Sequence, residues 1–203
     1  TVEEPAVAML SVHNLMKLVA GAPLIRPAWF FDIHQQGEGL SDVGVHVVDL
    51  AQWTLFPDTA LDYRKDVVML RGERWPTVLT EEQFRRVTAE PGFPAFLKPW
   101  IKDGRLEYFC NNRVSYTLRG VHIKLDVIWE YEAVPGAGDK YEATFRGSKS
   151  RVEVRQGQEE NFRPEIYVVP NRGEDLPGVR AALEAKLKAL AGRLPGLGVA
   201  ESG

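Results

Sequence analysis

The chain has 203 residues, of which 44% are hydrophobic and 26% charged, and its formal net charge is −3. This is the composition of an ordinary globular protein, and its scattered Lys and Arg residues form no basic stripe for a nucleic-acid backbone. Charges break the apolar runs well short of a membrane span, and the single cysteine, Cys110, excludes an internal disulfide. We therefore expect a soluble protein that binds neither nucleic acid nor membrane.

The first quarter of the chain predicts a helix, a strand and a second helix. Glu3–Ala20 carries leucines at helical spacing and ends before Gly21, as helices often do. The aromatic run Arg26–His34 predicts a strand. Ser41 is an expected N-cap for a helix that closes at Leu55. One side of this helix is apolar, with Val43, Val47, Leu50 and Thr54.

Strands dominate the rest of the chain. Tyr63–Leu70 predicts a strand, and Thr80-Glu-Glu-Gln83 is a capping box that opens a short helix through Val87. Leucines at helical spacing then predict a C-terminal helix over 178–195. Three further strands are expected at Tyr141–Phe145, Arg151–Arg155 and Ile166–Val169.

The clearest sheet signal is the alternation over Val121–Tyr131, which gives one apolar and one mostly polar face. We expect Leu106–Leu118 to pair with this strand, with Asn111-Asn112 as a turn. The order of elements predicts an α+β fold, an open, largely antiparallel sheet with helices packed on one face. The other face is either solvated or a subunit interface, and its side chains include His122, Lys124, Asp126, Ile128 and Glu130.

A glycine-rich turn, Gly37-Glu-Gly39, leads into the helix that carries Asp42 and His46 one turn apart. A carboxylate in the first helical turn is favoured by the macrodipole, and it would favour the protonated form of a neighbouring imidazole. Such a histidine is suited to take a proton from a substrate hydroxyl, and the glycines would let a ligand approach the backbone. The predicted polar side of the helix holds Asp42, His46, Asp49 and Trp53.

The surrounding residues suit a sugar-like polyol, which needs flat apolar surfaces together with hydrogen-bonding groups. Aromatic rings, amide and guanidinium donors and a further carboxylate are all close in the sequence. The predicted substrate-binding residues are Arg26, Trp29, Gln36, Glu38 and Trp53.

Two other interpretations stay open. In the first, the chain is a non-enzymatic ligand-binding or dimerisation module, and His46 and Trp53 are core residues under the sheet. In the second, Asp42 and His46 hold a divalent ion together with His34 and Glu38, as in a metal-dependent hydrolase. Neither G-x-G-x-x-G nor G-x-x-x-x-G-K-[ST] occurs, so any nucleotide would be bound by a part of a longer chain that lies upstream.

The stretch Gly39-Leu-Ser-Asp42-Val-Gly44-Val-His46-Val-Val-Asp49-Leu resembles the G-x-x-x-D-x-G-x-H-x-x-D-L signature of the Gfo/Idh/MocA oxidoreductases. The similarity extends over about Val12 to Pro170, the expected core of a single domain spanning residues 1–203. The other segments that carry it are Pro27-Ala-Trp29, Gln36-Gly-Glu-Gly39, Thr80 with Phe84, Trp129-Glu-Tyr131 and Gly136-Ala-Gly-Asp139.

This resemblance implies the C-terminal, substrate-binding half of an oxidoreductase. In that family an N-terminal Rossmann domain, absent from this chain with its E-K-P lysine, binds NAD or NADP. The resemblance assigns proton transfer to His46 with Asp42 in support, and it implies a homo-oligomer through the open sheet face. We expect a cytoplasmic enzyme, or a periplasmic one if an upstream signal exists, and a fragment that is inactive alone.

Overall fold

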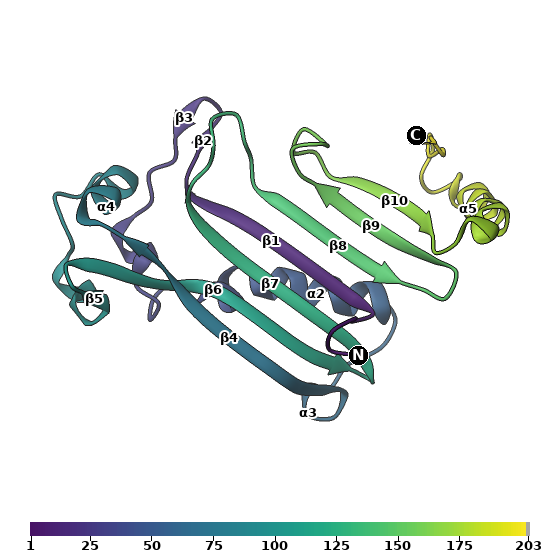
Figure 1. Cartoon of the computed structure of the whole chain (residues 1–203), viewed down its shortest axis with the longest axis horizontal. Coiled ribbons are helices and arrows are strands. Elements are labelled where there is room, and N and C mark those ends of the chain that lie inside the picture. Colours follow the sequence, from purple (N-terminus) through teal and green to yellow (C-terminus); the bar gives the residue numbers. More distant parts are fainter. Residues whose placement is uncertain (202–203) are drawn as a thin grey trace.

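A computed structural model describes residues 1–201 of the chain. Within this range the strands form an eight-stranded sheet in the order β10-β9-β8-β1-β7-β6-β4, with β5 beside β6 (Figure 1). The strands are β1 (Val7–Met16), β4 (Val67–Leu79), β5 (Ile101–Lys102), β6 (Arg105–Leu118), β7 (Val121–Glu132), β8 (Lys140–Arg146), β9 (Ser150–Gln156) and β10 (Glu165–Pro170), with β2 (Leu18–Val19) and β3 (Ala22–Pro23) in a separate ribbon.

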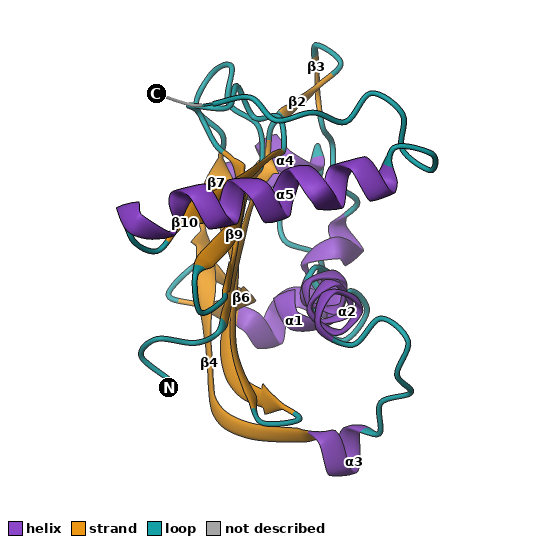
Figure 2. Cartoon of the chain, turned by 90° about the vertical axis from the view of Figure 1, so that its right-hand side faces the viewer, coloured by secondary structure: helices purple, strands orange, loops and turns teal. Residues whose placement is uncertain are grey.

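The helices are short and lie mostly in the first half of the chain. Figure 2 shows the sheet edge-on, with α1 and α2 together on one of its faces. The helices are η1 (Ala28–Phe31), α1 (Gly39–Asp42), α2 (Gly44–Leu55), α3 (Tyr63–Asp66), α4 (Glu81–Thr88), η2 (Ala95–Trp100), η3 (Gly173–Asp175) and α5 (Leu176–Leu190).

The core lies between the helices and the central strands β1, β7 and β6. Val47 and Ala51 of α2 pack there against apolar side chains of the sheet. The alternation in β7 places its odd-numbered residues on this helix face and its even-numbered residues on the open face. The α+β class, the open sheet and its largely antiparallel pairing are therefore confirmed; only β1 and β7 pair in parallel among the described strands.

Several predicted elements are found close to their expected bounds. β6 pairs with β7, β8 pairs with β9, and β10 adds a further strand. The Thr80 hydroxyl accepts from the Gln83 N–H while the Gln83 side chain accepts from the Thr80 N–H, which is the predicted capping box of α4. The C-terminal helix covers Leu176–Leu190 rather than 178–195. β4 covers Val67–Leu79, longer and later than predicted.

The prediction of a helix over Glu3–Ala20 is wrong, because most of that segment is β1. β1 lies between β8 and β7, so both of its edges are paired. This central strand has apolar residues at consecutive positions over Val7–Leu10, and a helical subset can be picked out of such a run.

The strand predicted over Arg26–His34 is also wrong, since Ala28–Phe31 forms the 3-10 helix η1. Pro27 precedes its first residue, a position that suits the fixed φ of proline. Phe30 and Phe31 are both buried, which a two-residue alternation does not allow on a sheet with one covered face.

Asn111 and Asn112 lie inside β6 and form no turn, contrary to prediction. The turn between β6 and β7 is Arg119-Gly120, and both residues have positive φ. The Asn111 amide nitrogen donates to Trp75 O and Thr77 Oγ1, and its oxygen accepts from Trp129 N. The register between β6 and β7 ends at Asn112. The Asn111 side chain therefore replaces backbone hydrogen bonds that the ladder no longer supplies.

Candidate active site

Asp42 and His46 lie at the junction of two helices and not on one regular helix, as was predicted. α1 ends at Asp42, and α2 begins at Gly44 after Val43. Ser41 lies within α1 and does not cap it. The helix is also rotated from the predicted orientation. Val47 and Ala51 are buried, whereas Leu50 and Thr54, which belonged to the predicted apolar side, are exposed.

Gly39 is the residue that lets α1 lie directly on the sheet. A Cβ at this position would lie 1.9 Å from Cys110 O and 2.8 Å from Asn112 Oδ1 of β6. The next residue, Leu40, donates its N–H to the same Asn112 oxygen at 2.8 Å. The missing side chain of Gly39 therefore serves the packing of α1 on β6, and not the approach of a ligand that the sequence suggested.

This packing places the Asp42 carboxyl, half-buried, over the centre of the sheet. Burial raises the pKa of Asp42 above its ordinary value. The charge of His13, a hydrogen bond from Gln36 and the charges of Arg26 and His46 oppose that effect, in this order, and do not overcome it. Asp42 is thus a desolvated carboxyl whose charge is incompletely compensated, a property that is common at functional sites.

A second group of polar side chains includes His13, whose charge acts on Asp42. His13 of β1 contacts Asp139 Oδ2 through Nδ1 at 3.0 Å and Ser11 Oγ through Nε2 at 2.8 Å. Lys17 Nζ donates to the same Asp139 oxygen at 2.5 Å. This group was not predicted from the sequence, because the segment that contains His13 was predicted to be a helix. Asp139 carried a signal, since it belongs to one of the segments on which the family resemblance rested.

Arg26 and Trp129 close the site on the side of β7. The Arg26 guanidinium lies 4.9 Å from the Trp129 ring, and the His13 imidazole stacks on the same ring, also at 4.9 Å between centroids. Arg26 donates Nε to Leu15 O at 2.7 Å and Nη2 to Asn14 O at 2.9 Å. Burial lowers the pKa of Arg26, despite the charges of Asp139 and Asp42 that favour its protonated form.

The five predicted substrate-binding residues have different positions. Gln36 donates a hydrogen bond to Asp42, and Arg26 lies close enough for its charge to act on this carboxyl. Glu38 forms an ion pair with Arg74 of β4. Trp29 and Trp53 are 47% and 72% exposed, and within residues 1–201 neither ring stacks on another aromatic side chain. The structure therefore groups two of the five around Asp42 and leaves the two tryptophan rings on the surface.

The metal-dependent alternative finds no ligand set in the described part of the chain. Among residues 1–201, no group of three or more His, Cys, Asp or Glu side chains is placed to hold a metal ion. Over the same range, no helix has both the length and the apolar character that crossing a bilayer requires.

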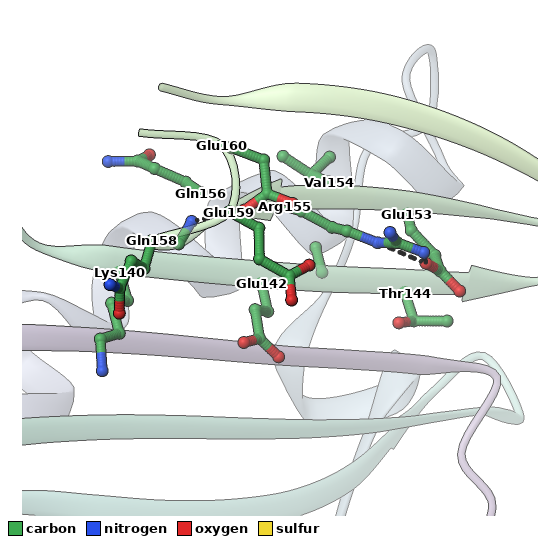
Figure 3. Close-up of a pocket in the computed structure, with 12 residues that line it drawn as sticks. Lys140, Glu142, Thr144, Glu153, Val154, Arg155, Gln156, Gln158, Glu159 and Glu160 are labelled. Atoms are coloured by element: carbon green, nitrogen blue, oxygen red, sulfur yellow. Dashed lines mark hydrogen bonds and ion pairs between the residues drawn. The ribbon is translucent and has the colours of Figure 1, made fainter. Parts of the chain in front are cut away.

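A hollow of about 740 Å³ lies elsewhere, between β8, β9 and the loop that follows β9 (Figure 3). Glu142 and Thr144 line it and pair with Leu10 and Ala8 of β1, which alternate with Ser11 on that strand. Paired residues point to the same face, so this hollow is on the open face, opposite Asp42. Its Arg155 is bound to Glu153, and it shares no lining residue with the Asp42 site.

The fold and the site define a class, an α+β domain that carries polar side chains between an open sheet and two short helices. A family model described as "Putative oxidoreductase C terminal domain" matches residues 1–203, and the chain belongs to that family. This confirms the prediction of a C-terminal oxidoreductase domain. No curated protein matches the chain.

Two solved structures are similar to the chain. A putative oxidoreductase from Parabacteroides merdae is 40% identical with a TM-score of 0.95, over 100% of this chain and 46% of that one. A putative oxidoreductase from Erwinia carotovora atroseptica is 14% identical with a TM-score of 0.54, over 94% of this chain and 48% of that one, and shares the fold. The chain thus spans about half the length of either protein.

Proposed function

We propose that this chain is the substrate-binding half of an NAD(P)-dependent oxidoreductase of the Gfo/Idh/MocA type, acting on a hydroxyl-bearing carbon of a sugar or polyol. In this proposal His46 transfers the proton and Asp42 supports it. The observation that carries the proposal is the placement of a half-buried, incompletely compensated Asp42 next to an exposed His46 at the start of α2.

The exposure of His46 supports this function over a non-enzymatic module. The non-enzymatic interpretation expects His46 to be packed under the sheet, but the residue is exposed. Exposed apolar side chains surround it on the outer side of α2, namely Val45, Leu50 and Trp53. Apolar surface around a polar site suits a position between two domains, because a second domain would cover it.

The chemistry assigned to this chain is proton transfer and orientation. The exposed imidazole of His46 accepts the proton of the substrate hydroxyl as the C–H bond of the same carbon breaks. Asp42, ionised, stabilises the imidazolium that forms. Nicotinamide, when bound by another domain, would accept the hydride from that carbon. The exposed rings of Trp29 and Trp53 offer flat surfaces to a pyranose-like substrate.

The proposal has further parts that belong to the whole enzyme. A dinucleotide-binding domain would dock on the outer side of α2, and NAD or NADP would be held there and not by this chain. A homo-oligomer would form through the open face of the sheet. The enzyme would act in the cytoplasm, where both dinucleotides are available.

The decisive experiment replaces His46 in the enzyme that contains this chain together with its dinucleotide-binding domain. We expect His46→Asn to lower kcat by about 100-fold or more, because general acid–base catalysis contributes roughly that much. The Kd for NADH or NADPH, measured by fluorescence titration, should stay within about 2-fold of the wild-type value. Equal activity in the variant and the wild type would overturn the assigned role.

A matched control is His34→Asn, which removes an exposed histidine that stacks on Trp100. This variant should retain wild-type activity. Calorimetric titration of NADH into residues 1–203 alone is a second test. Micromolar binding by this chain would contradict the assignment of the cofactor to another domain.

A further inference from the structure

Arg26 is a partly buried cation that forms no ion pair within residues 1–201. The charges of Asp139 and Asp42 act on it, but neither carboxylate contacts its guanidinium. A buried charge is costly unless it is paired, so an unpaired one marks a place for an anion from outside the chain. The other partly buried arginines of the described residues are all bound to a carboxylate, namely Arg113, Arg151 and Arg155.

Contacts with the protein fix the Arg26 guanidinium but leave one of its nitrogens without a partner. Nε donates to Leu15 O at 2.7 Å, and Nη2 donates to Asn14 O at 2.9 Å. The guanidinium carbon lies 4.4 Å from the centre of the Phe30 ring and 4.9 Å from that of Trp129. Nη1 has no partner among residues 1–201, and it is not fully enclosed, whereas the unpartnered Nε1 of Trp129 is. Nη1 is therefore a fixed donor that solvent reaches.

Tyr108 of β6 supplies a second donor of this kind. The residue is 1% exposed, and its ring packs on Phe30 at 5.9 Å and on Phe31 at 5.2 Å between centroids. Its hydroxyl has no partner within the described residues and is not fully enclosed, so the small exposed part of this side chain includes the hydroxyl oxygen. Burial raises the pKa of Tyr108, which keeps the hydroxyl protonated. Arg26 and Tyr108 thus both pack on Phe30 and both present a hydrogen that lacks an acceptor.

The neighbouring polar side chains are already bound to one another. Asp139 and Ser11 contact the two ring nitrogens of His13 at 3.0 Å and 2.8 Å, which fixes the orientation of the imidazole. Lys17 donates to Asp139 at 2.5 Å. Apart from the exposed His46, the donors of this site that remain for a ligand are therefore the guanidinium and the phenol described above.

The two donors lie on the same face of the sheet as Asp42. Tyr108 and Cys110 are two residues apart in β6, so their side chains point to one face. α1, which ends at Asp42, packs on the backbone of Cys110 through Gly39. A single substrate could therefore place its reacting hydroxyl at Asp42 and another group at Arg26.

We propose that Arg26 and Tyr108 bind a carboxylate of the substrate, so that the enzyme acts on a sugar acid and not on a neutral sugar. This inference rests on the proposed function, whose substrate class it narrows. A carboxylate accepts from both donors and supplies the negative charge that Arg26 lacks. A singly charged group suits the site better than a phosphate, because the charges of Asp42 and Asp139 also reach Arg26 and would repel a dianion.

The test compares D-glucuronate with D-glucuronamide, two probes of nearly the same shape that differ in the charge of one group. Calorimetric titration measures the binding of each to the 203-residue chain, which encloses a continuous hydrophobic core within its described residues. We expect glucuronate to bind about 10-fold more tightly, because a charge-assisted pair with a guanidinium is stronger than a neutral hydrogen bond. Equal affinity for the two probes would overturn the inference.

Substitutions assign this preference to the two donors. Arg26→Gln should reduce it to within about 2-fold, and Arg26→Lys should recover part of it, because lysine keeps the charge without the fork of donors. Tyr108→Phe keeps the ring packed on Phe30 and should weaken glucuronate binding about 3-fold through the lost hydroxyl bond. The control is Arg105→Gln, at an exposed arginine of β6, which should leave both affinities unchanged. The amide spectrum of each variant reports its fold, and a preference that survives both Arg26→Gln and Tyr108→Phe would overturn the inference.

The enzyme with its dinucleotide-binding domain separates this inference from the function on which it rests. There, Arg26→Gln should leave the Kd for NADH within about 2-fold of the wild-type value. A loss of NADH affinity with unchanged glucuronate binding would assign Arg26 to the cofactor and overturn the inference. If His46→Asn stays active while glucuronate binding still depends on Arg26, the proposed function fails and the carboxylate site holds. If His46→Asn is inactive while the two probes bind equally, the carboxylate site fails and the function stands.

Discussion

Carboxyl groups on the two faces of the sheet have pKa values that are shifted in opposite directions, as Glu153 and Asp42 show. On the open face, burial would raise the pKa of Glu153 of β9, but ion pairs with Arg151 and Arg155 outweigh burial, and the pKa is lowered. On the helix face, burial of Asp42 outweighs His13, Gln36 and its other partners, and the pKa is raised. Glu153 is a carboxyl with its counter-charges in place, and Asp42 is one without enough of them.

The same contrast runs along β7. The odd-numbered side chains from Ile123 to Trp129 are buried on the helix face, while Asp126 on the even side is held by Arg113 at 2.5 Å and Lys124 at 3.4 Å. A carboxyl whose charge is fully paired has no need of a ligand, whereas an undercompensated carboxyl beside an exposed histidine gains from one. The comparison therefore favours the helix face for the proposed chemistry, although a hollow of about 740 Å³ lies on the open face.

The largest effect should come from Gly39→Ala, which tests whether the helix face depends on the contact between α1 and β6. The added Cβ would lie 1.9 Å from Cys110 O, a backbone atom of the central strand β6, so the backbone itself would have to shift. We expect a loss of roughly 4 kcal/mol or more in the free energy of unfolding, measured by urea denaturation. Gly178→Ala, in α5 with nothing within 4 Å, is the matched control and should change stability by less than about 1 kcal/mol. Equal effects would show that α1 does not need this close approach.

Elements whose structure depends on residues close in the sequence were predicted correctly. The capping box of α4 needs two side chains three residues apart, and the alternation in β7 needs one covered face; both are visible without the fold. The turn at Arg119-Gly120 was also visible as a glycine between two apolar runs, but the adjacent asparagines drew the prediction to 111–112.

Prediction from the sequence was wrong where the structure of a segment depends on a partner that is distant in the chain. β1 is a strand because β7 and β8 flank it, and both come more than 100 residues later in the chain. The same separation along the chain explains why His13 and Asp139 were not predicted as part of the candidate site. Asp42 and His46 are four residues apart and could be paired by eye, while His13 and Asp139 are joined only once the sheet has formed.

A smaller effect should separate the two faces of β7 directly. Leu125 is 1% exposed on the helix face, and we expect Leu125→Ala to cost roughly 3 kcal/mol through lost burial and the cavity left behind. Ile128→Ala, on the open face of the same strand, should cost less than about 1.5 kcal/mol in the monomer. Urea denaturation of both variants checks the difference. A reversal of the order would mean that the open face is the better-packed one, as a subunit interface would be.

The smallest effect concerns Asp139, whose environment can be tested by pH alone. Burial by itself would raise the pKa of this carboxyl, but the bonds from His13 and Lys17 outweigh burial and lower the pKa to about 2, against an ordinary value of 3.8. A carboxyl with a lowered pKa stabilises the folded state fully above its unfolded pKa, and this contribution is lost as the pH falls from about 4 to about 2. After allowance for solvent screening, its size is on the order of 1 kcal/mol.

Asp139→Asn should therefore lower the free energy of unfolding at pH 7 and flatten its dependence on pH between about 4 and 2. Glu165→Gln supplies a control, since Glu165 is exposed and bonds only to the Tyr167 hydroxyl of its own strand among the described side chains. Urea denaturation at closely spaced pH values measures both slopes. If Asp139→Asn kept the wild-type slope, the bond between His13 and Asp139 would contribute nothing to the folded state, and the fixed orientation of His13 would lose its physical basis.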